Sequence, residues 1–389
     1  MRNFPLIALL TVILAGCEQK TETATQPPTE PPVTATPPPP AAAPAPAMKP
    51  AALRSPSWAP PASSDTLVRL AGRLYRLRIA VETDTTKPLT VREAKDGRPS
   101  VAQGYEGRFT FTLRDSTGRQ LFQREVRKGA FFKNFSPTAI VTSGARLPSL
   151  LGYSAPMGAL VFSLDFVMPD TDFGSQVLLL LDLKGQVLRT ADGHSWGGGP
   201  DCRPALAADG RALLTGSEVL RAGQAPLRLE KPDAELVGAL LLTDSTLLTV
   251  YSPGKVHRVQ LPDGTTGYRQ TPSPQQLRAP NALVRRLRDG QVLGTFQYQG
   301  FYEVLGPNIP RYYLRASKTT YLMDEKRGLY LLPRATPGAV TELKFAEMPV
   351  FSAPQTAAEV RFAINSEGAE FVFYADTTSS VPRIRYQKR

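Results

Sequence analysis

A short apolar strand, a turn built on an acidic residue and a second apolar strand recur along residues 155–375. This recurring unit restricts the fold class of the chain more than any other feature of the sequence. It occurs six times, with turn positions at residues 185, 210, 245, 290, 325 and 368. Short apolar runs on either side of a polar turn predict β-hairpins. No window keeps an apolar period of about 3.6 residues, so we expect an all-β fold and no helical one.

The segment before these hairpins shows a stricter alternation of apolar and polar residues. Residues 108–114 alternate, and a second apolar run at 120–126 follows the polar turn at 115–118. A period of two is typical of antiparallel strands that place one face on a core and the other in water. We therefore predict an antiparallel β unit over residues 65–130 and a further β domain over residues 131–389.

The spacing of the six hairpins bears on the architecture of that further domain. Repeats near 40 residues, each supplying four strands, are typical of β-propellers. The hairpins here resemble the degenerate "strand, Asp-Gly turn, strand" units of bacterial propellers, and the resemblance implies a propeller-like domain. Successive turns lie 25 to 45 residues apart and no Trp-Asp signature recurs. A β-sandwich or an irregular two-sheet fold therefore stays open as the alternative.

The N-terminus carries a different pattern. Arg2 precedes an apolar run over residues 4–14, which is too short to span a bilayer and ends in Leu14-Ala15-Gly16-Cys17. This ending resembles the lipobox of bacterial lipoproteins. The resemblance implies that residues 1–16 are a signal peptide and that Cys17 carries a diacylglycerol and an amide-linked acyl chain such as palmitate. Two or more acyl chains give stable membrane attachment without a transmembrane helix.

The residues after the cysteine refine where the protein is expected to lie. Glu18 occupies the position where, in many lipoproteins of two-membrane bacteria, an aspartate favours the inner membrane. Its absence favours the outer membrane, and the choice between the periplasmic and the exterior face stays open. Residues 17–64 contain fourteen of the 37 prolines. We expect this segment to be a disordered, extended spacer that holds the following domain away from the lipid.

The chain has a formal net charge of +12, and its spacer is close to neutral, so the excess lies in the β-rich part. A basic surface attracts anionic partners, here an anionic glycan, a glycolipid or an envelope protein. A solvated face without a partner is the alternative. No nucleic-acid motif accompanies the charge, so nucleic acid is not expected. The basic clusters are Arg69, Arg73, Arg76 and Arg78; Arg285, Arg286 and Arg288; and Arg383, Arg385, Lys388 and Arg389.

Cysteine and histidine usage gives little support to a metal site. With Cys17 lipidated, Cys202 stands alone, which rules out an intramolecular disulfide and favours a small buried apolar side chain. No His/Cys spacing fits zinc. Asp170-Thr171-Asp172 begins like a calcium loop but lacks the further carboxylates. We expect neither a metal nor another cofactor.

Gly193-His194-Ser195-Trp196-Gly197 matches the pattern G-x-S-x-G. It resembles the nucleophile elbow of α/β-hydrolases, which would make Ser195 a nucleophile. The elbow needs a strand, a tight turn and a helix, whereas Gly and Pro residues follow here. The single histidine further along, His257, lies in an expected strand. We therefore expect no catalytic residue here and interpret the segment from Asp192 to Cys202 as a loop.

That loop collects the candidate ligand-binding residues Asp192, His194, Ser195 and Trp196, because binding sites on a β scaffold tend to lie in its loops. The sequence thus predicts a membrane-anchored lipoprotein of the cell envelope. Its β-rich domain would bind a partner or ligand without catalysis. The alternatives are an envelope hydrolase or lyase with a site on one propeller face, and a binder of an anionic glycan or glycolipid.

Overall fold

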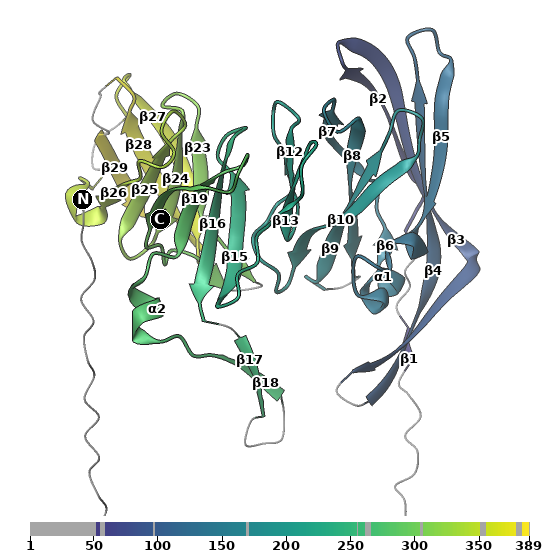
Figure 1. Ribbon diagram of the computed structural model, residues 1–389, viewed down its shortest axis with the longest axis horizontal. Coiled ribbons are helices and arrows are strands. Elements are labelled where there is room, and N and C mark those ends of the chain that lie inside the picture. The colour runs from purple at the N-terminus through teal and green to yellow at the C-terminus, as the bar shows by residue number, and fades with distance from the viewer. Residues whose placement is uncertain are drawn as a thin grey trace, which may run out of the picture. The chain divides into compact units, whose positions relative to one another are not determined.

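A computed structural model describes residues 52–54, 59–95, 98–168, 171–254, 256–260, 266–303, 306–350, 355–378 and 383–388. The expected signal peptide, Cys17, most of the expected spacer and Asp170 lie outside these ranges. Pro50–Arg389 forms one compact unit. Its described part is almost entirely β-structure, and the strands form sheets of antiparallel neighbours, except that β1 runs parallel to β4 (Figure 1).

The N-terminal sheet has the strand order β1-β4-β3-β2, with β5 beside β4. Strand structure begins before residue 65, because β1 and the start of β2 fall inside the range assigned to the spacer. The strands are β1 (Ala52–Arg54), β2 (Ala62–Leu70), β3 (Arg73–Lys95), β4 (Arg98–Arg114) and β5 (Gln120–Arg127). The alternation at 108–114 and 120–126 forms the predicted β4–β5 hairpin.

Two short helices, η1 (Lys128–Phe131) and α1 (Pro137–Thr142), connect this sheet to the second sheet. The strands of the second sheet are β6 (Gly144–Ala145), β7 (Ser149–Ser154), β8 (Ala159–Val167), β9 (Gly174–Leu181) and β10 (Val187–Trp196). The continuous run of leucines on β9 is explained by burial on both faces. Leu179 and Leu181 pack against the N-terminal sheet, whereas Leu178 and Leu180 pack against the third sheet.

Three four-stranded sheets and one three-stranded sheet follow in chain order. The third sheet is β11 (Ala205–Leu206), β12 (Ala212–Leu214), β13 (Glu218–Arg221) and β14 (Leu227–Arg228). The fourth is β15 (Ala234–Leu241), β16 (Thr246–Pro253), β19 (Ala282–Arg286) and β20 (Val292–Phe296). The fifth is β23 (Arg311–Leu314), β24 (Thr319–Asp324), β25 (Gly328–Pro333) and β26 (Thr341–Lys344). The sixth is β27 (Glu359–Ser366), β28 (Ala369–Asp376) and β29 (Arg383–Lys388).

Short hairpins and helices lie in the connections between these strands. Between β16 and β19 lie the hairpin β17 (Val256–Gln260) and β18 (Thr266–Gln270) and the helix α2 (Pro274–Arg278). The short pair β21 (Tyr302–Glu303) and β22 (Pro307–Asn308) precedes the fifth sheet, and η2 (Phe345–Glu347) follows it. No helix among the described residues is long and apolar enough to cross a membrane.

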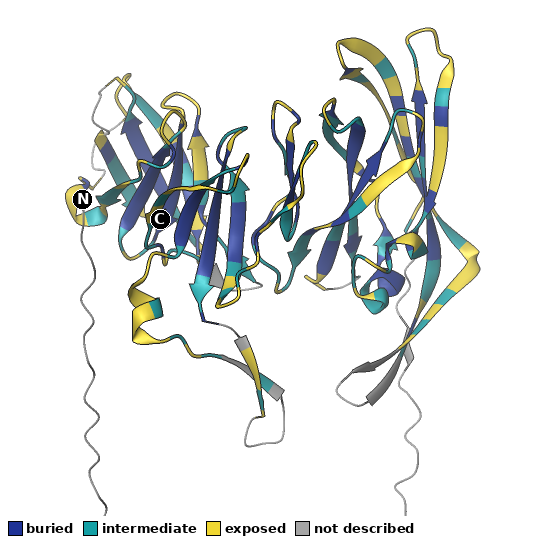
Figure 2. Ribbon diagram, in the orientation of Figure 1, coloured by how far each residue is buried: buried dark blue, intermediate teal, exposed yellow. Residues whose placement is uncertain are grey.

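The hydrophobic clusters of the described residues each join two sheets that follow one another in the sequence. The inner strands are buried over most of their length, while α2 and the outer face of the N-terminal sheet are exposed (Figure 2). Strands of neighbouring sheets also meet, as β7 with β11 and β23 with β27. Antiparallel four-stranded sheets stacked through their faces in chain order make a propeller-like fold, as the sequence predicted.

All six hairpins predicted from the sequence are present as antiparallel pairs. The β9–β10 turn shows how an acidic residue stabilises such a hairpin. Asp182 Oδ1 accepts hydrogen bonds from the backbone N–H groups of Lys184 and Gln186, at 2.8 and 2.7 Å. A carboxylate in this position replaces backbone partners that a tight turn leaves unsatisfied.

Candidate functional site

The four candidate residues lie on a strand, so the interpretation of residues 192–196 as a loop is wrong. β10 is the edge strand of the second sheet and runs to Trp196. Asp192 stands opposite Val177 on β9, and Ser195 stands opposite Ser175, so three steps on β10 match two on β9. The extra residue is a β-bulge at Gly193 and His194, a device that redirects side chains.

Glycine is required at this bulge. A Cβ on Gly193 would lie 2.9 Å from both the side chain and the carbonyl oxygen of Gln176. The third sheet also approaches closely, because the Gly216 N–H donates to the Asp192 carbonyl at 2.8 Å. A Cβ on Gly216 would stand 2.1 Å from the Gly193 carbonyl oxygen. The glycines that resemble a loop in the sequence therefore allow two sheets to make backbone contact.

The four candidates divide into two pairs. Asp192 and Ser195 line a cavity of about 330 Å³. His194 and Trp196 are not among its lining residues and pack against each other, with ring centroids 5.3 Å apart at 85°. The structure therefore brings together two of the predicted binding residues in one hollow and places the other two outside it.

Three successive sheets and the segment before α1 build this cavity. Its polar and aromatic lining side chains are Asn134, Phe135, Gln176, Asp192, Ser195, Ser217, Glu230 and Glu235. Three of them are carboxylates, two are amides and two are hydroxyls, and the lining includes no lysine or arginine among the described residues. The site is thus rich in hydrogen-bond acceptors and carries negative charge.

Several of the lining groups are held in place by hydrogen bonds. Asn134 Nδ2 donates to Asp192 Oδ1 at 3.3 Å, across 58 residues of sequence. Asn134 Oδ1 is buried and, among the described residues, has no hydrogen-bond partner. Gln176 Nε2 donates to Asp165 Oδ1 at 2.8 Å, which fixes the orientation of that amide. Buried acceptors are nearly always paired in folded proteins, so the Asn134 oxygen is an exception in this structure.

Ser195 does not have the surroundings of a nucleophile. Its Oγ lies 3.3 Å from the Ser175 hydroxyl, within the β9–β10 pairing near its end. Residues 197–204 after the strand form a turn and extended chain, so the strand–turn–helix geometry of an elbow is not formed. His257, on β17, is exposed. Among the described residues no group of three or more His, Cys, Asp or Glu side chains is placed to hold a metal ion.

His194 lies near a buried ion pair that the sequence did not single out. Asp201 is 2% exposed and its carboxylate accepts hydrogen bonds from the Ile309 N–H at 3.0 Å and from the Arg311 guanidinium. Burial alone would raise the pKa of Asp201, but the hydrogen bond and charge of Arg311 outweigh it and leave that pKa below its ordinary value. Burial lowers the pKa of His194, which favours the neutral imidazole at pH 7.

Cys202 follows this pair and is fully buried, as its lone position in the sequence suggested. Burial raises the pKa of the Cys202 thiol to about 12. A thiol needs to ionise to act as a nucleophile or metal ligand. Cys202 is therefore a core side chain of the third and fourth sheets.

No protein-family model and no curated protein matches this chain. Among solved structures, the β-propeller domain of the Trilobed protease from Pyrococcus furiosus aligns with 84% of this chain and 94% of its own, at 11% identity and a TM-score of 0.27. A protein of unknown function from Bacteroides caccae aligns over 62% and 79%, at 11% identity and a TM-score of 0.23. Apo AztD from Citrobacter koseri aligns over 83% and 89%, at 8% identity and a TM-score of 0.19. The fold assignment rests on the strand pairings and packing within this chain.

The sequence missed most of the cavity. Asn134 and Gln176 come from segments without any motif. Glu230 lies in the connection between the third and fourth sheets, and Glu235 lies at the start of β15. Their only signal is spatial, because the packing of the second, third and fourth sheets brings them to Asp192. The segment containing Asp192 and Ser195 could be found from its unusual composition, since it collects Gly, Ser, His and Trp.

Proposed function

We propose that this protein is a lipoprotein of the cell envelope, anchored through Cys17, whose β domain binds a ligand in the cavity lined by Asp192 and Ser195. The observation that carries the binding function is that polar side chains from separate segments, among them Asn134, Gln176 and Asp192, line one cavity. The cavity volume of about 330 Å³ falls at the lower end of the range of about 300–1,000 Å³ typical of small-molecule sites.

The lining indicates the class of ligand. Carboxylates, amides and hydroxyls suit a molecule that presents many hydroxyl or amide donors. Phe135 adds an aromatic ring for an apolar face. A carbohydrate has both features, so we propose a neutral or amino-bearing saccharide as the ligand. Binding without bond cleavage fits the position of Ser195 within a strand.

Calorimetric titration with glucose, galactose, N-acetylglucosamine and their β-linked disaccharides tests this function. At least one should bind, and Asp192→Asn and Gln176→Ala should each weaken binding by about tenfold, the cost of one lost hydrogen bond to a charged or buried group. Val187→Thr, an exposed position on the same strand, is the matched control and should bind as the wild type does. Absence of binding to every saccharide, or full binding by Asp192→Asn, would exclude the proposal.

A further inference from the structure

The outer face of the N-terminal sheet holds a groove of about 600 Å³ that the proposed saccharide site does not use. Its walls come from β2, β3, β4 and β5, on the side of the sheet that points away from the hydrophobic core. Arg76, Arg78 and Arg114 line it. Its other polar lining residues include Thr110, Thr112, Gln123 and the acidic residues Asp65 and Glu82. Arg76 and Arg78 belong to the first basic cluster of the sequence, whereas Arg114 lies outside that cluster.

The strand register forces these cations together. Arg76 on β3 stands directly opposite Arg114 on β4, and the next row on this face pairs Arg78 with Thr112. Arg78 and Arg114 are therefore diagonal neighbours, roughly 7–8 Å apart. Like charges directly opposite each other destabilise a sheet unless a counter-charge lies between them.

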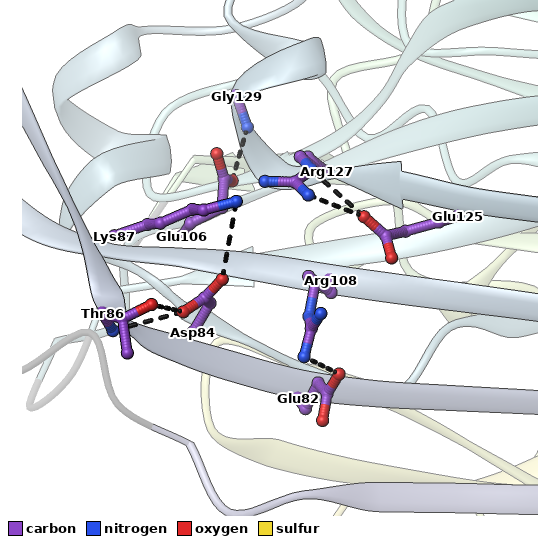
Figure 3. Close-up of polar contacts among 9 residues, drawn as sticks. All are labelled: Glu82, Asp84, Thr86, Lys87, Glu106, Arg108, Glu125, Arg127 and Gly129. Atoms are coloured by element: carbon purple, nitrogen blue, oxygen red, sulfur yellow. Dashed lines mark hydrogen bonds and ion pairs between the residues drawn. The ribbon is translucent and has the colours of Figure 1, made fainter.

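Three of the described arginines on the strands of this sheet have such a counter-charge within the protein. Arg76 Nε donates to Asp65 Oδ1 at 2.8 Å. Figure 3 shows Arg108 paired with Glu82 and Arg127 paired with Glu125.

Arg78 and Arg114 differ from these neighbours. Asp65 stands opposite Arg78 in the register, but its carboxylate bonds to Arg76 instead. In the part of the chain that the structure describes, neither Arg78 nor Arg114 has an acidic oxygen within 4.0 Å. Both side chains are exposed, so their donors are open to a ligand.

An apolar patch adjoins the cations on the same face. Leu67 and Leu74 are 65% and 43% exposed, and they lie on the β2–β3 hairpin in the same alternation as Asp65 and Arg76. Large aliphatic side chains beside unpaired arginines form an amphipathic surface. Such a surface suits a ligand with an anionic group next to an apolar part.

We propose that this groove binds a phosphate group between the guanidinium groups of Arg78 and Arg114, and that the phosphate belongs to a lipid headgroup. The planar guanidinium donates two parallel hydrogen bonds to a phosphate, which makes paired arginines a preferred phosphate site. The Thr112 hydroxyl, between the two, is a further donor. Leu67 and Leu74 would contact the apolar part of the lipid. The groove and the saccharide cavity share no lining residue. An experiment can therefore exclude one proposal without excluding the other.

The test uses the mature polypeptide from residue 17 with Cys17→Ser, so that no acyl chain contributes to membrane binding. Co-sedimentation is measured with vesicles of phosphatidylcholine alone and of phosphatidylcholine with phosphatidylglycerol, and calorimetry with inorganic phosphate. We expect binding to the anionic vesicles only, and a decrease with salt. Arg78→Gln with Arg114→Gln should weaken it by at least about tenfold. Thermal melting should show that this variant folds, since it removes a repulsive cluster.

The control Arg286→Gln with Arg288→Gln removes the same charge from the fourth sheet, where Asp289 pairs with both arginines. It should bind the vesicles as the parent does. Leu67→Ser with Leu74→Ser should weaken vesicle binding and leave phosphate binding unchanged, which separates a lipid from a soluble phosphate. Equal binding to neutral and anionic vesicles, or equal losses in both arginine double variants, would overturn the proposal.

Discussion

The side chain of Lys128 connects strand β4 of the N-terminal sheet to helix α1, which precedes the second sheet. This side chain is fully buried, and Nζ donates to the carbonyl oxygens of Tyr105, Val141 and Ser143 at 3.0, 3.0 and 2.7 Å. Two of these carbonyls lie at the end of α1, where helical acceptors lack partners. The ammonium group thus satisfies three buried acceptors, although burial lowers the pKa of Lys128 to about 8.

Lys128→Met should destabilise the protein by about 2–4 kcal/mol, because the variant leaves buried carbonyl groups without a donor. Urea unfolding at pH 7 measures the change. Lys133→Met, at a nearby exposed lysine, should stay within about 0.5 kcal/mol of the wild type. A Lys128→Met protein as stable as the wild type would show that the three hydrogen bonds contribute nothing.

A second residue-scale effect concerns pH. Glu359 accepts two hydrogen bonds of 2.6 Å from Arg385, and this contact lowers the pKa of Glu359 from 4.5 to about 2. Since the folded-state pKa is below the unfolded one, the unfolded chain binds more protons between pH 4.5 and 2. The stabilisation is therefore complete above pH 4.5 and is lost as the pH falls toward 2.

Glu359→Gln should remove this part of the pH dependence of unfolding. The check is the free energy of unfolding measured from pH 6 to pH 2 for both proteins. The wild-type curve should fall more steeply than the variant curve below pH 4.5. Parallel curves over this range would contradict the account of this pair.

At the scale of elements, the tight Asp-Gly hairpins could be predicted because their chemistry is local. The turn carboxylate, the glycine and the flanking apolar runs all lie within about ten residues of one another. The bulge on β10 could not be predicted, because it depends on pairing with β9 and on contact with Gly216 in another sheet. Glycines that permit close backbone approach look in a sequence like glycines of a loop.

Gly216→Ala tests that contact. The added methyl would stand 2.1 Å from the Gly193 carbonyl oxygen, so the third sheet would have to move away from β10. We expect a loss of about 2–4 kcal/mol in the free energy of unfolding and weaker saccharide binding. Gly129→Ala is the control, since its new Cβ would meet the nearest atom at 3.5 Å. Equal stability of the two variants would mean that the sheets are not locked together there.

At the scale of the whole molecule, a few long-range contacts order the stack of sheets. Asp201 lies before the third sheet, exchanges backbone hydrogen bonds with Val237 and Ala239 on β15, and forms an ion pair with Arg311 on β23. One residue thus links the fourth and fifth sheets. The sequence predicts the strands of each sheet but contains no local signal for this order, because residues 201 and 311 are far apart in the chain.

Asp201→Ala should cost about 3–5 kcal/mol, since it leaves the Arg311 guanidinium half-buried without its partner. The double variant Asp201→Ala with Arg311→Met should recover part of the loss, because no unpaired charge is left. Denaturant unfolding of the wild type, of Asp201→Ala and Arg311→Met singly, and of the double variant gives the coupling energy. A double variant whose loss equals the sum of the two single losses would show that the pair is not coupled.

The proposed location of the whole protein in the cell envelope depends on lipidation of Cys17. Metabolic labelling with radioactive palmitate, followed by immunoprecipitation, compares the wild type with Cys17→Ser and with the control Cys202→Ser, which replaces the buried cysteine. The account predicts label in the wild type and in Cys202→Ser, and in Cys17→Ser no label and a longer, uncleaved precursor. Label and normal processing in Cys17→Ser would contradict it.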